Sequence, residues 1–206
     1  MTPARGDHDA RRQEVSEAVW RVLSSRGFEG LTLRAVAAEM SASTGLLTHY
    51  FPNKRALVAH ALEELDRRSL ARPRRIAPAD GSPPPPAGLP RLRAALLDIL
   101  PLDGPATAGN RIWVGSWDVA LADPELAAAH AARYARSRDV LTEQVEVAQR
   151  LGELPDGVAA AQLAAGAQAF VLGLVVQVMF APAEFPPARQ QELLDAYLAG
   201  LAGLAA

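Results

Sequence analysis

Apolar residues in the first 70 positions recur at the spacing of helix faces. The first such face covers about residues 9–25 and follows an i, i+3, i+4, i+7, i+8 pattern of apolar side chains, namely Val15, Ala18, Val19, Val22 and Leu23. The glycine-containing stretch RGFEG then ends the pattern. This arrangement predicts a helix that buries one face against a core.

Three more helices are predicted before residue 72. Thr32 can cap a short second helix through its hydroxyl group. A third helix follows Ser43 and ends before Pro52, because proline disfavours the α conformation at the residue that precedes it. A fourth helix starts near Lys54 and again has apolar residues at helical spacing.

Two short helices joined by a tight turn are typical of a helix-turn-helix, whose second helix enters the major groove of DNA. Leu47 and Phe51 are expected to anchor the third helix to its own core. Hydroxyl groups and polar aromatic tips can reach bases and phosphates, glycine allows close approach of the backbone, and helix N-termini attract phosphate. The expected DNA-contacting residues are Thr32, Arg34, Ser43, Thr44, Gly45, Thr48, His49, Tyr50 and Lys54. A capped surface helix without any DNA is the alternative interpretation.

Charge is unevenly distributed along the chain. The net charge is −2, but residues 1–75 hold 13 Lys and Arg against 9 Asp and Glu, and the remainder holds 8 against 14. A basic first third favours a module that binds a polyanion, while clustering of arginines on solvated helix faces explains the charge equally well.

Residues for catalysis or metal binding are not evident. The chain has no cysteine, and its four histidines lack the spacing of metal ligands. No nucleophile elbow or phosphate-binding glycine loop is present. We therefore expect no catalytic residue, no metal and no cofactor. No secretory signal is visible at the N-terminus, and a cytoplasmic location is expected.

Residues 72–90 interrupt the helical pattern, since 7 of these 19 residues are proline. Helices are expected again at about 90–100, 106–122, 124–151, 158–181 and 187–204. The predicted fold is all-α with about nine helices. We divide it into a helix-turn-helix DNA-binding domain at 1–52, a connecting helix at 53–71, and a ligand-binding and dimerisation domain at 72–206 that begins with a proline-rich linker at 72–90.

The stretch from Gly157 to Ala183 contains no charged residue and is long enough to span a bilayer. Three glutamines interrupt it and its flanks are acidic, which argues against a membrane span. Ala165, Ala169 and Gly173 place small residues at every fourth position, so another helix can approach closely. We expect a homodimer formed through the last two helices and no contact with membranes.

A small-molecule site is expected in the C-terminal part. Pockets for small molecules combine aromatic side chains with a few polar groups. Residues of these types recur at helical spacing, and the candidate ligand-binding residues are Asn110, Trp113, Trp117, Tyr134, Phe170, Leu174 and Gln177. Ordinary core packing is the alternative for each of them.

The stretch GLTLRAVAAEMSASTGLLTHYFPNKRALV resembles the helix-turn-helix of TetR-family transcriptional regulators. Within it, STGLLTHYF is most similar to the BetI branch, because Thr48 supplies a small hydroxyl residue where many family members have tyrosine. The resemblance covers residues 9–70, and RIWVGSWDVALADPELAAAH resembles the sixth and seventh helices of BetI-like regulators. The chain departs from the family at Ser41 and Ala42, where Gly-Val is usual, and in its proline-rich stretch.

The resemblance implies a homodimer that binds a palindromic operator through two recognition helices. It also implies a C-terminal pocket in which a small-molecule inducer weakens DNA binding, and we expect the chain to act as a repressor. Two other interpretations stay open: an all-α small-molecule-binding protein or enzyme without DNA binding, and a module that uses the helical hairpin to dock another protein.

Overall fold

The computed structural model describes residues 5–78 and 81–203, with side chains from residue 10 onward. Within these ranges the chain is all-α, as predicted, and contains no strand. The ten helices are α1 (Arg5–Arg26), α2 (Leu33–Glu39), α3 (Thr44–Tyr50), α4 (Lys54–Ala71), α5 (Leu89–Leu97), α6 (Gly104–Gly115), α7 (Trp117–Leu121), α8 (Pro124–Arg150), α9 (Ala160–Phe180) and α10 (Pro187–Ala202). Residues 79 and 80 of the predicted linker, and residue 204 of the last predicted helix, lie outside the described residues.

The described chain forms two compact units. The first comprises the residues up to Arg72 together with Ile112–Leu126, and the second comprises Pro73–Arg111 and the residues from Ala127 onward. Helices α6 and α8 therefore each contribute residues to both units. The division of function between a DNA-binding part and a ligand-binding part stays a prediction.

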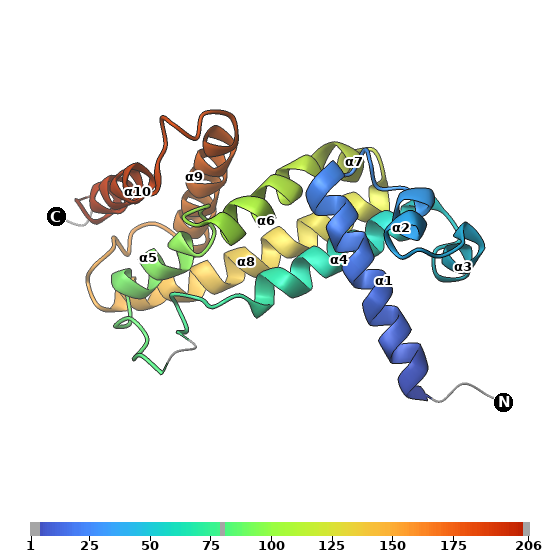
Figure 1. The fold of residues 1–206 in the computed structure, drawn as a ribbon. Coiled ribbons are helices and arrows are strands. Elements are labelled where there is room, and N and C mark those ends of the chain that lie inside the picture. The colour runs from blue at the N-terminus through green and yellow to red at the C-terminus, as the bar shows by residue number, and fades with distance from the viewer. Residues whose placement is uncertain (1–4, 79–80, 204–206) are drawn as a thin grey trace. The chain divides into compact units, whose positions relative to one another are not determined.

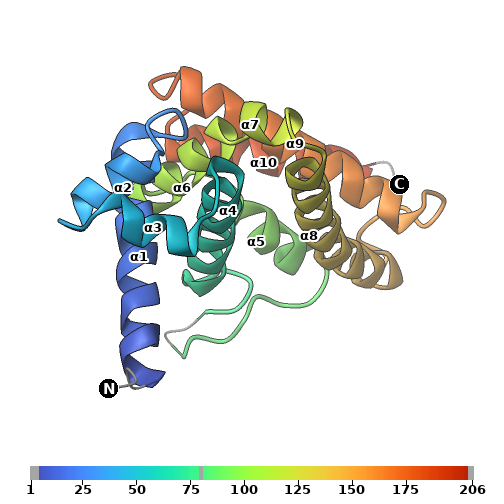
Figure 2. The same ribbon diagram turned by 90° about the vertical axis from the view of Figure 1, so that its right-hand side faces the viewer.

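The first unit is built around α1. This helix packs against α2 and α4, and α2 packs against α3 (Figure 1). Figure 2 shows α1 and α4 side by side. The five apolar positions predicted from the first helical pattern are all buried in the core of this unit. Ile112, Ala120 and Leu126 join the same core, which explains why this later segment belongs to the first unit.

In the second unit, α5 packs against α9 and α10. The backbone amide of Leu89, at the start of α5, donates to the carboxylate of Glu153 over 2.7 Å. A side chain at Gly88 would collide with this carboxylate, since a Cβ there would lie 2.1 Å from Glu153 Oε2. Gly88 also has a φ of 90°, which glycine tolerates best. The negative carboxylate of Glu153 is stabilised at the positive N-terminal end of the helix dipole. Its hydrogen bond to Leu89 fixes the start of α5.

The described parts of the proline-rich stretch contain no helix before Leu89, as expected. They are nevertheless tied to α5. The carboxylate of Asp98 accepts hydrogen bonds from the backbone amides of Arg75 at 2.8 Å and Ile76 at 3.2 Å. The guanidinium of Arg91 donates to the carbonyl of Pro85.

The prediction of a single helix at 106–122 is wrong, because the structure divides this segment into α6 and α7. At the break, the buried Ser116 donates both its backbone amide and its hydroxyl to the carbonyl of Trp113, at 3.1 and 2.6 Å. These bonds to the third preceding residue tighten the turn and end α6. Trp117 thus begins a new helix and does not extend the helix that carries Asn110 and Trp113.

The turn between α2 and α3 contains an unusual backbone conformation. Ser41 has a φ of 52°, and it is the only non-glycine residue with positive φ in the described chain. This left-handed conformation brings Cβ close to the following carbonyl in every L-residue, and glycine avoids the clash. Ser41 is also the position at which the resembled family usually has glycine.

We predict that Ser41→Gly stabilises the protein. Relief of the left-handed strain is worth about 1–2 kcal/mol and the added freedom of the unfolded chain costs about 0.5–1 kcal/mol, so the net gain is about 0.5–1 kcal/mol. Thermal unfolding followed by calorimetry measures it. Gly27, with a φ of 64° and no atom within 4 Å of a Cβ placed there, is the matched control, and Gly27→Ser should lower Tm. A lower Tm for Ser41→Gly contradicts the strain at this turn.

Candidate nucleic-acid interface

Helix α3 is fixed at both ends and on its inner face. Ser43 caps its start, with its hydroxyl oxygen accepting from the backbone amide of Leu46 at 3.3 Å. Phe51 ends it, since its amide donates to the carbonyl of Leu47 at 2.8 Å while its backbone turns to an extended conformation. Leu47 is 0% exposed and Phe51 5% exposed. These two side chains hold the helix against the core of the first unit, as predicted.

The opposite side of α3 faces solvent. Thr44, Gly45, Thr48 and His49 are all exposed, and Tyr50 is half-buried. The hydroxyl of Thr48 donates to the carbonyl of Gly45 at 2.8 Å. The structure therefore brings Thr44, Gly45, Thr48 and His49 together on one accessible surface, whereas Tyr50 packs against the core of the first unit.

Two further predicted residues mark the starts of neighbouring helices. Thr32 caps α2 by accepting from the amide of Ala35 at 3.1 Å, and Arg34 in its first turn is exposed. Lys54 is the first residue of α4 and is also exposed. The cap of α4 is Asn53, whose side chain accepts from the amide of Ala56 at 2.9 Å. Sequence reasoning missed Asn53, although an asparagine before a run of helix-forming residues is a known start signal.

Arg55, next to Lys54, was also missed. It forms ion pairs with Asp123 at 3.2 Å and with Glu125. Both partners belong to the first unit, at the junction between α7 and α8. Arg55 therefore ties the start of α4 to this junction. Lys54, the other cation at this end of the helix, is exposed to solvent.

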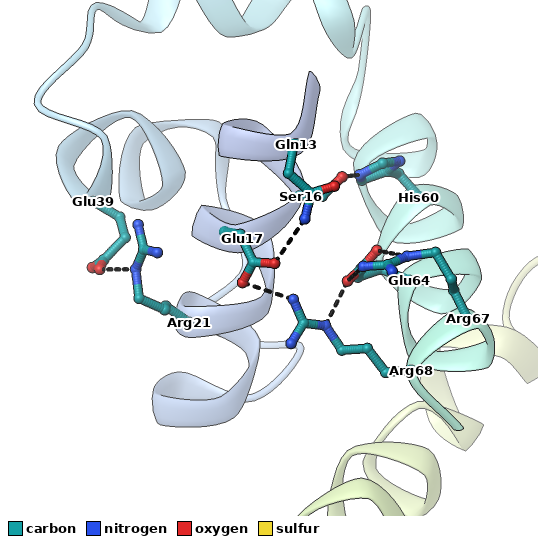
Figure 3. Close-up of polar contacts among 9 residues, drawn as sticks. All are labelled: Gln13, Ser16, Glu17, Arg21, Glu39, His60, Glu64, Arg67 and Arg68. Atoms are coloured by element: carbon teal, nitrogen blue, oxygen red, sulfur yellow. Dashed lines mark hydrogen bonds and ion pairs between the residues drawn. The ribbon is translucent and has the colours of Figure 1, made fainter. Parts of the chain in front are cut away.

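The seam between α1 and α4 contains a buried carboxylate (Figure 3). Glu64 is 4% exposed and accepts from Nε and Nη2 of Arg67, at 2.9 and 2.6 Å, and from Nε of Arg68 at 2.5 Å. Arg68 also pairs with Glu17 of α1 at 2.7 Å, and its guanidinium lies 4.6 Å from the ring centre of Trp20. Alternating charges thus connect α1 and α4, whose buried side chains belong to the same core as Leu47.

Burial alone raises the pKa of Glu64, but the hydrogen bonds and positive charges of Arg67 and Arg68 outweigh it and lower the pKa. One turn earlier on α4, His60 lies 3.0 Å from the Ser16 hydroxyl of α1, and burial lowers the pKa of His60. The His60 ring also contacts Phe51, with ring centres 5.2 Å apart. A cavity of about 280 Å³ lies beside these polar side chains.

The candidate ligand-binding residues are distributed over both units. Trp113 and Trp117 belong to the first unit, and the other five belong to the second. Asn110 donates its amide to the carbonyls of Ile99 and Ala106, at 3.1 and 3.0 Å. The indole N–H of Trp117 is buried without a hydrogen bond among the described residues.

The remaining candidates lie on α8 and α9. The Tyr134 carbonyl accepts from the side chain of Gln168 at 3.1 Å. Phe170 stacks on Tyr197 of α10 with ring centres 4.3 Å apart. Leu174 is buried and Gln177 is exposed. A ligand-binding role for any of the seven residues stays a prediction.

A short, capped helix with a polar outer side, joined to α2 by a tight turn and packed against it, is the layout of the helix-turn-helix regulators of transcription. The chain belongs to the TetR family of DNA-binding transcriptional regulators. Residues 16–61 match the family model for bacterial regulatory proteins of the tetR family, and residues 89–203 match that for the C-terminal part of BetI-type transcriptional repressors. The family is one of regulators and not of enzymes.

Curated relatives agree with this assignment. The chain is 32% identical over 111 residues to the transcriptional regulator PksA of Bacillus subtilis, which covers 54% of this chain and 52% of PksA. It is 31% identical over 128 residues to the regulator BetI of Paraburkholderia phytofirmans, covering 60% of this chain and 62% of BetI. The matched parts thus span about half to three fifths of these relatives.

Solved structures share the fold over nearly the whole chain. A transcriptional regulator from Rhodococcus sp. RHA1 is 25% identical, with a TM-score of 0.76 and coverage of 92% of this chain and 94% of the other. A transcriptional regulator from Saccharomonospora viridis, crystallised with choline, is 19% identical, with a TM-score of 0.78 and coverage of 93% and 96%.

We predict that Glu64→Gln destabilises the protein by about 2 kcal/mol at neutral pH, because it weakens charged hydrogen bonds to two arginines. The lowered pKa of Glu64 means that its contribution is present above the ordinary carboxyl pKa of about 4.3 and is lost as the pH falls through the lower native value. Urea unfolding at pH 7 and at pH 3.5 measures the difference, which should shrink at the lower pH. The exposed neighbour Glu63 is the control, and an equal loss in Glu63→Gln contradicts a specific role of Glu64.

Proposed function

We propose that this chain is a cytoplasmic repressor that binds a palindromic operator as a homodimer and is released from DNA by a small-molecule inducer. The observation that supports DNA binding best is the arrangement of α3. Its inner side is fully buried through Leu47, and its outer side presents Thr44, Gly45, Thr48 and His49 to solvent. A helix of this kind fits the major groove, where polar side chains and exposed backbone meet base edges.

Phosphate contacts would come from the cations and helix starts around α3. Lys54 at the first position of α4 places a positive charge where the helix dipole also attracts an anion. Arg34 and the caps Thr32 and Ser43 are proposed to contact the DNA backbone on either side. The excess of Lys and Arg over Asp and Glu in residues 1–75 supports attraction to DNA.

Homodimer formation is proposed through α9 and α10. Along α9, Ala161, Ala165, Ala169 and Gly173 are exposed at every fourth position. Phe180 at the end of the helix is 83% exposed. Helix α9 is long and apolar enough to cross a membrane by length and composition alone, a property that buried helices of soluble proteins share. An exposed strip of small apolar residues on such a helix suits close packing against the same helix of a second copy.

An inducer is proposed to bind the C-terminal part, through the five candidate residues that belong to the second unit. Release follows if the inducer binds the DNA-incompetent form more tightly than the DNA-bound form. A screen for release of bound DNA starts with choline, because a regulator of the same fold was crystallised with it. A small-molecule-binding protein without DNA binding is the alternative, and the following experiment separates the two.

We predict that a DNA sequence selected from a random pool binds the wild-type protein with a steep salt dependence. His49→Ala and Gly45→Ala should each weaken binding about fivefold to tenfold per half-site. A Cβ at Gly45 would have only the Ser43 hydroxyl within 4 Å, at 3.8 Å, so Gly45→Ala should fold normally.

Lys54→Ala should flatten the slope of log affinity against log salt by about 0.9 for each phosphate that the lysine neutralises. Fluorescence anisotropy at four salt concentrations measures both quantities.

Arg150→Ala, which removes an exposed cation at the end of α8, is the matched control for Lys54→Ala. Lys54 is also the only lysine in the chain, so an amine-reactive reagent modifies this side chain and the α-amino group alone. Bound DNA should protect Lys54 from that reagent. Unchanged affinity in all three variants, together with no protection of Lys54, rules out the proposed interface.

We predict that Ala169→Glu converts the dimer to a monomer, because it places a charge in the exposed apolar strip of α9. Size-exclusion chromatography with light scattering gives the mass of each species. Ala131→Glu, at an exposed position of α8, is the control and should leave the dimer intact. A dimeric Ala169→Glu protein excludes this strip as the interface.

A further inference from the structure

The recognition helix lacks the side chains that usually read bases by paired hydrogen bonds. Helix α3 has the sequence TGLLTHY and contains no Arg, Lys, Asn or Gln. Arginine and lysine are the common bidentate readers of guanine, and asparagine and glutamine are those of adenine. Acidic side chains that accept from cytosine are absent as well. Base recognition by α3 is therefore left to single hydrogen bonds and to contacts with methyl groups.

Thr44 and Thr48 lie on the same face of α3, one helical turn apart. The hydroxyl of Thr48 donates to the carbonyl of Gly45 at 2.8 Å, so its proton is already used inside the helix. Such a bond back to the preceding turn also fixes the side-chain rotamer of threonine. The branch that stays free for contact is the Cγ2 methyl group.

Gly45 lies between the two threonines in the sequence and adds to the same surface. It is exposed, and a Cβ placed there would have only the Ser43 hydroxyl oxygen within 4 Å, at 3.8 Å. The backbone at Gly45, one turn before Thr48, is thus open to close approach. Thr44, Gly45 and Thr48 together form an exposed surface that includes the Thr48 methyl group, and we call it the methyl-reading patch.

We propose that the methyl-reading patch recognises thymine in the operator through its 5-methyl group. Thymine alone among the four bases presents a methyl group in the major groove, and threonine methyl groups are suitable partners for it. This inference rests on the proposed function, in which α3 enters the major groove. It adds the chemical property that is read and the residues that read it. His49 is left to form a single hydrogen bond to a neighbouring base.

The test replaces each thymine of the selected operator by uracil, which removes the methyl group and keeps the hydrogen-bonding edge. Burial of one methyl group corresponds to about a fourfold change in affinity. Wild-type protein should bind about fourfold more weakly when uracil replaces the contacted thymine in one half-site, and about 15-fold more weakly with uracil in both. Anisotropy titrations at one fixed salt concentration measure these ratios.

Matched protein variants identify the reader. Thr48→Ser removes the methyl and keeps the hydroxyl, and Thr48→Val does the reverse; the same pair is made at Thr44. At a reading threonine, the serine variant lacks the methyl group in both subunits of the dimer. It should therefore bind the thymine operator about 15-fold more weakly, and it should lose nothing further on the operator with uracil in both half-sites, which is the coupling expected for a direct contact. The valine variant should bind the thymine operator as tightly as wild type. Thermal unfolding of each variant checks that the fold is kept.

Wild-type affinity for uracil at every position, while Gly45→Ala and His49→Ala still weaken binding, overturns the methyl readout and leaves α3 on the DNA. Valine variants that lose affinity where serine variants keep it also overturn the proposal, since a hydrogen bond would then be the readout. Failure of the proposed function gives a different result: all variants of α3, including Gly45→Ala and His49→Ala, then bind as tightly as wild type.

Discussion

The burial of Leu47 is the constraint on which the candidate DNA-binding surface depends. A helix of seven residues is far too short to be stable alone, so packing must hold α3 in place. Leu47 is fully buried, which is worth about 1.5–3 kcal/mol, and its carbonyl accepts the amide of Phe51 that closes the helix. Because the helical repeat is about 3.6 residues, fixing Leu47 inward also turns Thr48, roughly 100° further around the helix, away from the core.

Leu47 belongs to a core to which α1, α2 and α4 all contribute buried side chains, and the charged seam joins α1 to α4. Arg68 contacts Glu17 and Trp20 on α1 and Glu64 on its own helix, so a shift of one turn would break the interactions that cross between the helices. A buried ion pair adds little net stability over apolar packing, but losing one partner is costly. We infer that the seam fixes the register of α1 against α4.

Much of the first unit is predictable from the sequence because its signals are local. The buried positions of α1 follow from apolar spacing, and Thr32, Ser43 and Pro52 mark helix ends through chemistry that involves neighbouring residues only. The left-handed φ of Ser41 is not predictable in this way, because the residues that suit a turn do not specify which of its positions is strained.

Long-range contacts carry even less local signal. The pairing of Arg55 with Asp123 joins residues far apart in the chain. The sequence contains many arginines, and nothing local indicates which of them pairs with Asp123. The aromatic residues proposed for the ligand show the same limit. Trp113 packs against the core of the first unit and Phe170 stacks on Tyr197, and helical spacing cannot distinguish such packing from a pocket lining.

The composition of α3 has a consequence for how specificity can arise. Methyl contacts discriminate between bases less strongly than bidentate hydrogen bonds, which reach about 1–3 kcal/mol each. A single copy of α3 that reads DNA in the proposed way would therefore select its site weakly, while its phosphate contacts would hold any sequence. Two copies multiply the modest discrimination, and the fixed distance between them adds half-site spacing as a requirement. In the proposed regulator, the apolar strip of α9 would thus contribute to operator specificity as much as the residues that touch the bases.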